Sequence, residues 1–442
     1  MNDTEEENIK EKINIEINRL IIDKWYFYES NWKIISKKYN HRTTLKYMKD
    51  INFIKDVLLN QLGYIPVFYF LNILYGTQEY PGPYPELDKG LILLYHLVCG
   101  LSGQKMSQFM CYATFYDLYK KFWIDNYKRI NKIINTDLLN LFSNIKIRLL
   151  SAKLYNPIGF KNVTLIIDGH DSKIKYYNPD TERIKLHSYK LKKPGVRTQI
   201  VCDMNKMIIY ISDSEKCGES NDGTMFLKMN LYNKLHIGDC LAMDGGYPLF
   251  INQFKENGIN LGYEFKDMHF MYPVRKEKDS KLSVNELHFN SVFGSFRSII
   301  ENEFSVIGSK FERFNNNRAS VQVSDIKHYN IQFKLSCLLK NIWQMVKDYN
   351  IEELPHHKLW YSDGFEFPIK ESKIQIAFND EIKINKNLIE ISTLQNKLLN
   401  MSLDELEVDS INFDEDEIME EEVSLKHKRV KKSIVYIEKP DR

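Results

Sequence analysis

The sequence predicts an α/β chain, α+β overall, in which an all-helical N-terminal region precedes a domain that contains a sheet. Apolar residues recur at helical spacing through much of the first 155 residues. Continuous, β-branched apolar runs begin near residue 162, and their length and composition indicate buried strands. A segment at 285–314 then carries apolar residues at steps of three and four, which is the stripe of a helix packed against a core. Strands followed by helices are typical of α/β or α+β domains.

Composition limits the class of protein. The chain has 442 residues, of which 43% are hydrophobic, so it can bury more than one core. Its longest apolar runs, at 64–76 and 90–101, are too short to span a bilayer, and we expect no membrane partner. Its acidic start is neither a secretory signal nor a transit peptide. The six cysteines have no CxxC spacing, which favours reduced thiols in an intracellular protein over a zinc site.

The formal charge of +2 hides an asymmetry between the body and the C-terminal tail. Residues 404–422 carry 11 acidic residues and no Lys or Arg, and a short basic stretch follows them. Residues 1–403 are therefore about +8, which permits a polyanion partner. We expect 404–442 to be a disordered tail, acidic and then basic, after a helical extension at 346–403. The cluster KHKRVKK at 426–432 resembles a nuclear-localisation signal and predicts a nuclear protein.

The helical half divides at PGPYPE, residues 81–86, because proline cannot continue a helix. Residues 1–86 are expected to form an N-terminal helical region. From Asp88 the pattern is a helix, a turn with glycine, a short helix, a second turn and a helix that ends near Lys121. This order is typical of a helix-turn-helix, which we place in a helical domain at 87–158, and an ordinary helical hairpin gives the same pattern.

In the part of the sequence that contains the predicted strands, two of these strands end in aspartate. Strands are predicted at 162–168, at 197–203 and 207–213 as a hairpin, at 241–244, and at 271–276. Asp168 and Asp244 end the first and fourth, and ligand sites gather where strands end. Glu301 lies with Arg297, four residues earlier, on one flank of the later helix. Three carboxylates can hold Mg²⁺ for phosphoryl chemistry. The alternatives are that each Asp is an ordinary turn former and that Arg297 and Glu301 form a surface salt bridge.

Several fragments stand in a recognisable order: IIDGHD at 166–171, GESNDGTMF at 218–226, LAMDGGYPL at 241–249, MYPVRK at 271–276, RSIIE at 297–301, KFERF at 310–314 and LSCLLKNIW at 335–343. Together they resemble the PIF/Harbinger-type transposases, a branch of the DDE superfamily, over roughly residues 85–345. The resemblance implies an RNase H-like catalytic domain with a mixed sheet at 159–345. It also implies that Asp168, Asp244 and Glu301 are the catalytic triad and bind two Mg²⁺ (or Mn²⁺) ions. The family's Arg-x₃-Glu motif matches Arg297 and Glu301, and it favours Glu301 over Glu303, which helical periodicity alone leaves open.

The resemblance implies a DNA transposase or derived endonuclease that cleaves and joins phosphodiesters. Arg297 and Asp222 are candidates for residues that support the triad, and Asp222 could equally be a helix N-cap or turn residue. His170 stands where the family often has Thr, and Asn221 where it often has His. Neither difference removes one of the three carboxylates of the implied triad. The alternative function is that of a domesticated, catalytically inactive DNA-binding or scaffold protein derived from a transposase.

Basic residues near the proposed site predict contact with DNA phosphates. Two clusters carry this prediction, Lys190, Lys192, Lys193 and Arg197 before the second strand, and Arg275 and Lys276 after the fifth. A solvated loop is the alternative for each. The implied partners are double-stranded DNA (transposon ends and target), further copies of the chain as a homo-oligomer on DNA, and a possible separate Myb-like DNA-binding protein.

Overall fold

The computed structural model describes residues 3–25, 33–34, 51–75, 86–176, 182–276, 281–317, 321–323, 325–362, 365–366, 384–391 and 393. The chain divides into two compact units, residues 1–367 and 368–442. The predicted boundaries at 86, 158 and 345 fall inside the first unit and remain predictions. In the second unit a helix is described at 384–391, with Ile384, Leu388 and Ile391 exposed. The predictions for 404–442 lie outside the described residues. None of the described helices is both long enough and apolar enough to cross a membrane.

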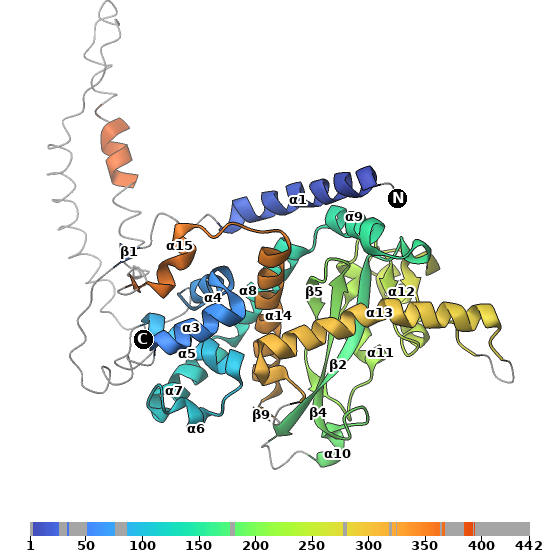
Figure 1. Cartoon of the computed structure of the whole chain (residues 1–442), viewed down its shortest axis with the longest axis horizontal. Coiled ribbons are helices and arrows are strands. Elements are labelled where there is room, and N and C mark those ends of the chain that lie inside the picture. Colours follow the sequence, from blue (N-terminus) through green and yellow to red (C-terminus); the bar gives the residue numbers. More distant parts are fainter. Residues whose placement is uncertain are drawn as a thin grey trace, which may run out of the picture. The chain divides into compact units, whose positions relative to one another are not determined.

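Where it is described, the N-terminal part of the first unit is helical, as predicted, apart from the two-residue strand β1 (Figure 1). Its helices are α1 (Asp3–Trp25), α3 (Ile51–Leu62), α4 (Tyr64–Tyr75), α5 (Glu86–Cys99), α6 (Gly103–Met106), α7 (Tyr112–Tyr119), a π-helical turn (Lys120–Asp125), α8 (Tyr127–Phe142) and α9 (Ile145–Tyr155). The strand β1 (Lys33–Ile34) pairs antiparallel with β10 (Phe365–Glu366), so it joins segments more than 300 residues apart. No local sequence pattern predicts such a pairing, since both strands are only two residues long.

Helices α5, α6 and α7 follow the predicted order of long helix, short helix and helix. Residues 87–98 of α5 are all buried, so this helix belongs to the core. The short α6 begins where the Ser102 hydroxyl accepts a hydrogen bond from the Lys105 amide. Helix α7 leaves Tyr112 and Tyr116 exposed. Use of these helices to bind DNA remains a prediction.

The sheet is mixed, as predicted. Its strands are β2 (Leu165–Tyr176), β3 (His187–Ser188), β4 (Lys193–Asp203), β5 (Ile208–Ile211), β6 (Glu215–Lys216), β7 (Leu241–Ala242), β8 (Phe270–Met271) and β9 (Val321–Val323). The main order is β3-β4-β2-β7-β8, with β5 and β6 also paired to β4 and β9 to β2. The pairs β2–β4 and β4–β5 are antiparallel, and β2–β7 and β7–β8 are parallel. The predicted hairpin of β4 and β5 is therefore confirmed.

Several strand predictions were wrong in their limits. The strand predicted at 241–244 ends at Ala242, so Asp244 lies two residues beyond β7 and does not end it. β2 continues well past Asp168, because β4 pairs with it as far as Lys173, opposite Gly195. Asp168 therefore lies inside a strand and does not end one. The strand predicted at 271–276 ends at Met271, and Pro273 follows it, which has no N–H for a ladder hydrogen bond.

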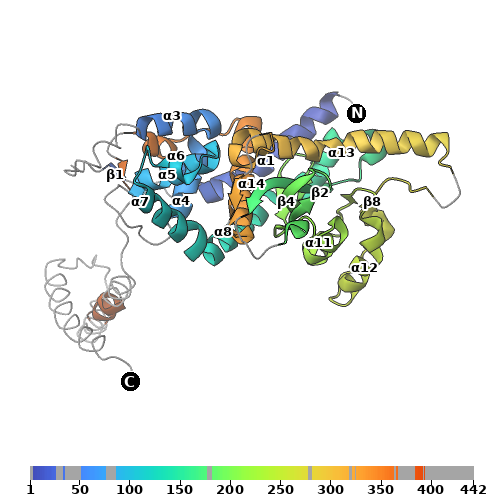
Figure 2. The same ribbon diagram turned by 90° about the horizontal axis from the view of Figure 1, so that it is seen from below.

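Helices lie on both sides of the sheet (Figure 2). The helices of this half are α10 (Arg183–Leu186), α11 (Asp222–Lys228), α12 (Ile251–Ile259), α13 (Val284–Lys310) and α14 (Ile326–Asp348). The short α15 (Pro355–Lys358) follows them and packs against α4 of the N-terminal part (Figure 1). The predicted helix at 285–314 is confirmed as α13 with a 3₁₀ turn at Glu312–Phe314, and its apolar stripe is buried at Phe293, Phe296, Ile300 and Ile307. A capping box starts α13, since Ser283 and Glu286 each accept the other's backbone N–H.

Helix α14 is the central helix of this unit, and residues 329–342 are all buried. Its polar side chains are satisfied by neighbouring elements. The Asn341 amide accepts from the Ile208 N–H at 2.9 Å and donates to the Ile208 carbonyl at 2.7 Å, which ties α14 to β5. Lys340 pairs with Glu303 of α13. These contacts hold α13 and the sheet in a fixed relation, and the candidate site lies where they meet.

Candidate active site

Two aspartates lie side by side because two neighbouring strands run parallel. In the β2–β7 register Leu165 faces Leu241 and Ile166 faces Ala242, so Asp168 and Asp244 stand two residues further along each chain. Each carboxylate accepts a hydrogen bond at 2.7 Å from the N–H of the glycine that follows it. The Asp168 side chain is 14% exposed and that of Asp244 58% exposed. The repeated Asp-Gly pairs thus form one acidic edge with a buried and an open member.

Arg297 of α13 joins the two aspartates. Its Nη1 lies 3.3 Å from Asp244 Oδ1, and its Nη2 lies 3.7 Å from Asp168 Oδ2. The guanidinium side chain is only 12% exposed. The alternative of a surface salt bridge between Arg297 and Glu301 is therefore wrong, because the guanidinium turns toward the sheet. One positive charge is shared by two carboxylates.

Glu301 lies on the same row of α13 as Arg297. Residues 297, 301 and 304 are at i, i+4 and i+7, so their side chains follow one another along one stripe. Arg297 contacts Asp168, and the Phe304 ring stacks on His170 with centroids 4.4 Å apart, two residues further along β2. Glu301 is exposed between these contacts. Among the described residues no three His, Cys, Asp or Glu side chains form a group that could hold a metal, so its part in the triad remains a prediction.

Glu303 is occupied elsewhere. Its side chain is 1% exposed and pairs with Lys340 of α14, whose side chain is fully buried. Glu303 therefore links two helices and is separated from the aspartates by its position on the other flank of α13. The choice of Glu301 over Glu303 as the third carboxylate remains a prediction.

Asp222 packs against the backbone of β2 beside Asp168. It is the first residue of α11, whose N-cap is Asn221, so the alternative assignment of Asp222 as the N-cap is wrong. A Cβ atom on Gly169 would lie 2.6 Å from Asp222 Oδ1, closer than real contacts allow. Successive residues of a strand face opposite sides, so Asp222 approaches from the side away from Arg297. The glycine after Asp168 is needed for this approach.

Burial and nearby charges together shift the pKa of Asp168 and of His170. Burial raises the pKa of Asp168, and the charge of Asp222 adds to the rise, while Arg297, the Gly169 N–H and Lys190 oppose it. Burial lowers the pKa of His170 to about 4, with a further contribution from Lys190, so the imidazole is neutral at pH 7. The ionised form of Asp168 therefore depends on nearby positive charge. Such a carboxylate is suited to binding a cation.

The predicted DNA-binding residues fall into two groups. Lys190, Lys192 and Lys193 are exposed at the turn between β3 and β4, as are Arg275 and Lys276 after β8. The segment after β8 is held against α13, because the Asn290 amide accepts from the Val274 N–H and donates to its carbonyl.

Arg197 differs from these exposed bases. It donates to Asp171 at 2.6 Å through Nε and at 3.0 Å through Nη2. Its Nη1 lies 3.5 Å from Asp222 Oδ1, and the side chain is 17% exposed. The Arg197 guanidinium is therefore bound to Asp171 and lies next to Asp222 inside the fold, and its predicted contact with DNA remains a prediction.

Two buried residues that were not predicted as site residues, Gln199 and Tyr247, form hydrogen bonds beside Asp222. Gln199 of β4 donates to the Asp222 carbonyl at 2.6 Å and to the Tyr247 hydroxyl at 3.0 Å. Tyr247 is fully buried, and burial together with the charges of Asp222 and Asp168 raises its pKa. The signal for Gln199 was a polar residue inside the apolar run RTQIVCD, and Tyr247 stood inside the motif LAMDGGYPL.

Comparison with known proteins gives one family match. Residues 167–341 match the family described as DDE superfamily endonuclease. The matched segment covers less than half of the chain and contains both aspartates, Arg297 and Glu301. It supports a transposase-like nuclease domain of the DDE type. Neither the curated proteins nor the solved structures contain a significant match to the chain.

Proposed function

We propose that the chain is a divalent-metal-dependent DNA transposase or derived endonuclease of the PIF/Harbinger type, with an RNase H-like catalytic domain. One observation carries the proposal. Asp168 and Asp244, placed together by parallel strands, share a single cationic partner inside the segment that matches the endonuclease family. The mixed sheet and the crossing helix α13 support the fold assignment.

The residues present fit a site for Mg²⁺ or Mn²⁺. Both aspartates offer hard oxygen donors and already face one positive charge, the Arg297 guanidinium. Asp168 and Asp244 would hold the metal, Glu301 would complete the set from α13, and two ions per site are expected. When bound, such ions stabilise the attacking and leaving oxygens of a phosphodiester displacement. Arg297 would then be released from the aspartates and could contact a DNA phosphate, with which a guanidinium forms strong bidentate bonds.

The proposal of a DNA partner is supported by exposed lysine and arginine side chains near the edge of the sheet that carries Asp168 and Asp244. Lys190, Lys192 and Lys193 on one side and Arg275 and Lys276 on the other would bind phosphates of double-stranded DNA without reading its sequence. The charge of Lys190 already reaches Asp168. Transposon ends and target DNA are the proposed substrates. A nuclear location, a homo-oligomer on DNA, a helix-turn-helix at 87–158 and a separate Myb-like partner belong to the same proposal.

A strand-cleavage assay on DNA ends from the flanking genomic locus tests this function. The full chain should nick the DNA with Mg²⁺ or Mn²⁺, and Asp168→Asn, Asp244→Asn and Glu301→Gln should each lower the rate by at least about 100-fold. DNA binding, measured by fluorescence anisotropy at fixed salt, should persist in all three variants. Glu256→Gln, an exposed carboxylate on α12, is the matched control and should cut normally. Unchanged cleavage in any of the three variants would remove that residue from the triad.

A domesticated, non-catalytic DNA-binding protein is the second candidate. It is favoured by the contact of Arg297 with both aspartates, which satisfies their charge within the chain. In this case the wild-type chain would bind DNA tightly and would nick none of it with either metal.

A further inference from the structure

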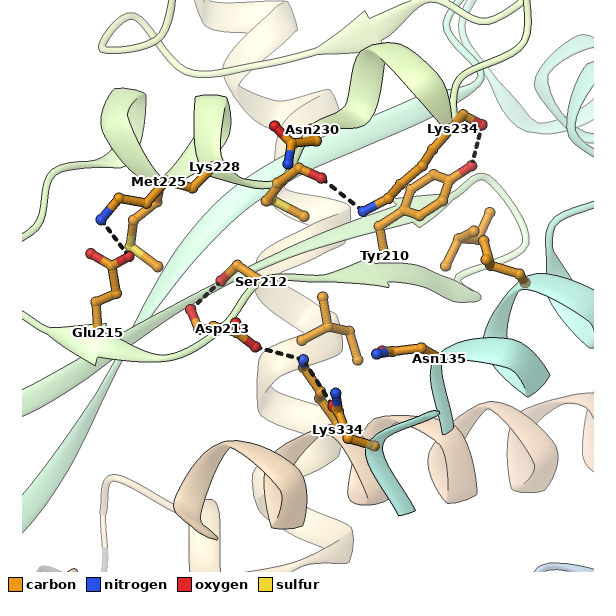
Figure 3. A pocket seen from close by; sticks show the side chains of 15 residues that line it. Asn135, Tyr210, Ser212, Asp213, Glu215, Met225, Lys228, Asn230, Lys234 and Lys334 are labelled. Atoms are coloured by element: carbon orange, nitrogen blue, oxygen red, sulfur yellow. Dashed lines mark hydrogen bonds and ion pairs between the residues drawn. The ribbon is translucent and has the colours of Figure 1, made fainter. Parts of the chain in front are cut away.

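A pocket of about 410 Å³ opens beside β5, between α8, α11 and α14 (Figure 3). It shares no lining residue with the candidate active site. Helix α11 connects the two places, since Asp222 begins the helix at the aspartates and Met225 lies in the pocket wall. The volume is within the range of small-molecule sites, roughly 300–1,000 Å³.

Among the described residues that line the pocket, three are lysines and two are acidic, Asp213 and Glu215. Lys228 pairs with Glu215 at 2.7 Å, and Lys334 contacts Asp213 at 2.9 Å. Lys234 donates to the Met229 carbonyl at 2.7 Å and forms no ion pair with a carboxylate of the described residues. Burial and the charge of Lys334 both lower the pKa of Lys234. Lys234 and Lys334 thus line the same pocket, and an anion bound there would give the Lys234 ammonium the counter-ion that it lacks among the described residues.

Amide and apolar side chains complete the wall. The Asn135 side chain projects from α8 and has no hydrogen bond within the described part of the chain. Asn230 accepts from the Tyr232 hydroxyl at 2.6 Å through Oδ1, which leaves its NH₂ group available. Ile209, Ile211 and Met225 supply an apolar surface, and a methionine sulfur packs well against flat rings.

We propose that this pocket binds a nucleoside monophosphate unit. The lining contains lysines and no arginine, which favours a phosphate bound by point charges over a carboxylate bound by a planar fork. Lys234 and Lys334 would hold the phosphate. The Asn135 amide offers a donor and an acceptor and the Asn230 NH₂ group offers a donor, which would match the edge of a base, and the apolar wall would cover its face.

Such a unit has two sources, a free mononucleotide or a nucleotide of single-stranded DNA. The second source rests on the proposed function, because a strand-cleaving enzyme would present it. Binding is measured without metal, and it is repeated in Asp168→Asn, which should bind nucleotide normally. A failure of cleavage and a failure of nucleotide binding are therefore separate results.

Calorimetric titration of the full chain tests the proposal, with deoxyadenosine monophosphate, adenosine, inorganic phosphate and a ten-nucleotide deoxyadenylate strand as probes. The monophosphate or the strand should bind at least tenfold more tightly than adenosine or phosphate. Lys234→Ala should weaken that binding at least tenfold, and Asn135→Ala should weaken it without changing the affinity for phosphate. Lys132→Ala, an exposed lysine of α8 outside the pocket, should have no effect. Binding of the strand alone supports the DNA source. Equal affinities in Lys234→Ala and Lys132→Ala, phosphate binding alone, or no saturable binding would overturn the proposal.

Discussion

The ion pair between Glu303 and Lys340 should be a sensitive point of the fold. The two side chains are 1% and 0% exposed, and the Lys340 ammonium also donates to the Lys206 carbonyl at 2.5 Å. The pair joins α13 to α14 and so fixes the rotation of the helix that carries Arg297 and Glu301. Removing one partner of such a pair leaves a buried charge without its counter-ion, which costs about 3–5 kcal/mol. This is a large part of a typical total stability of about 5–15 kcal/mol.

A double-mutant cycle separates the pair from the general cost of mutation. Glu303→Met and Lys340→Met should each lower the free energy of unfolding by about 3–5 kcal/mol, because each leaves one charge in the core. The double variant replaces both charges with apolar side chains of similar size and should lie within about 1 kcal/mol of the wild type. The coupling energy should therefore be several kcal/mol, well above the values of sites that act independently.

Urea unfolding monitored by tryptophan fluorescence supplies the measurement, since Trp343 lies on α14 itself. The control is the surface pair of Lys153 and Glu5, whose side chains are 56% and 49% exposed. The same replacements there should change stability by less than about 1 kcal/mol. If the single core variants cost as little as the control and the double variant costs their sum, the pair would not be a desolvated link between the helices.

Two further predictions concern β2. Gly169→Ala should lower the free energy of unfolding by about 1–3 kcal/mol, because the new Cβ would lie 2.6 Å from Asp222 Oδ1, and Asp222→Gly in the same chain should recover most of the loss. Gly294→Ala on α13, where a Cβ meets open space, is the control and should not destabilise. For His170, the pKa is about 4 in the fold and near 6.5 in the unfolded chain, so the unfolded state binds more protons between these values and stability falls as the pH falls through this window. Between pH 7 and pH 4 the wild type should lose up to about 3 kcal/mol relative to His170→Phe, measured by unfolding at each pH, and parallel curves would contradict this assignment.

The sequence was informative where one pattern repeats over a long segment. The apolar stripe of α13 predicted its buried face correctly, since a spacing of three and four residues kept over this long helix leaves little ambiguity. Short β7 and β8 were located by their apolar residues, but their limits depend on the neighbours that pair with them. The length of β2 was missed for the same reason. Polar residues such as Asp168 and His170 stand inside a strand only because β4 lies beside them.

The candidate site was predictable in its members and not in its contacts. Helical geometry allowed Arg297 to pair with Glu301, four residues away, or with a residue of another element. The sequence alone does not show which strands lie next to α13, so it could not predict the second pairing. The structure shows why that choice is favourable. Asp168 is mostly buried, and an ionised carboxylate in that position needs a cation more than the exposed Glu301 does.

Charge balance also accounts for the position of Glu301. Asp168 and Asp244 already share the one positive charge of Arg297, and Asp222 raises the negative potential at Asp168 further. A third carboxylate drawn into this edge would meet like charges in a partly desolvated place, which is costlier than remaining in water. Additional positive charge would reverse that preference, and the side chain lies on the row of α13 from which it could turn inward. The predicted dependence of DNA cleavage on divalent cations follows from this balance.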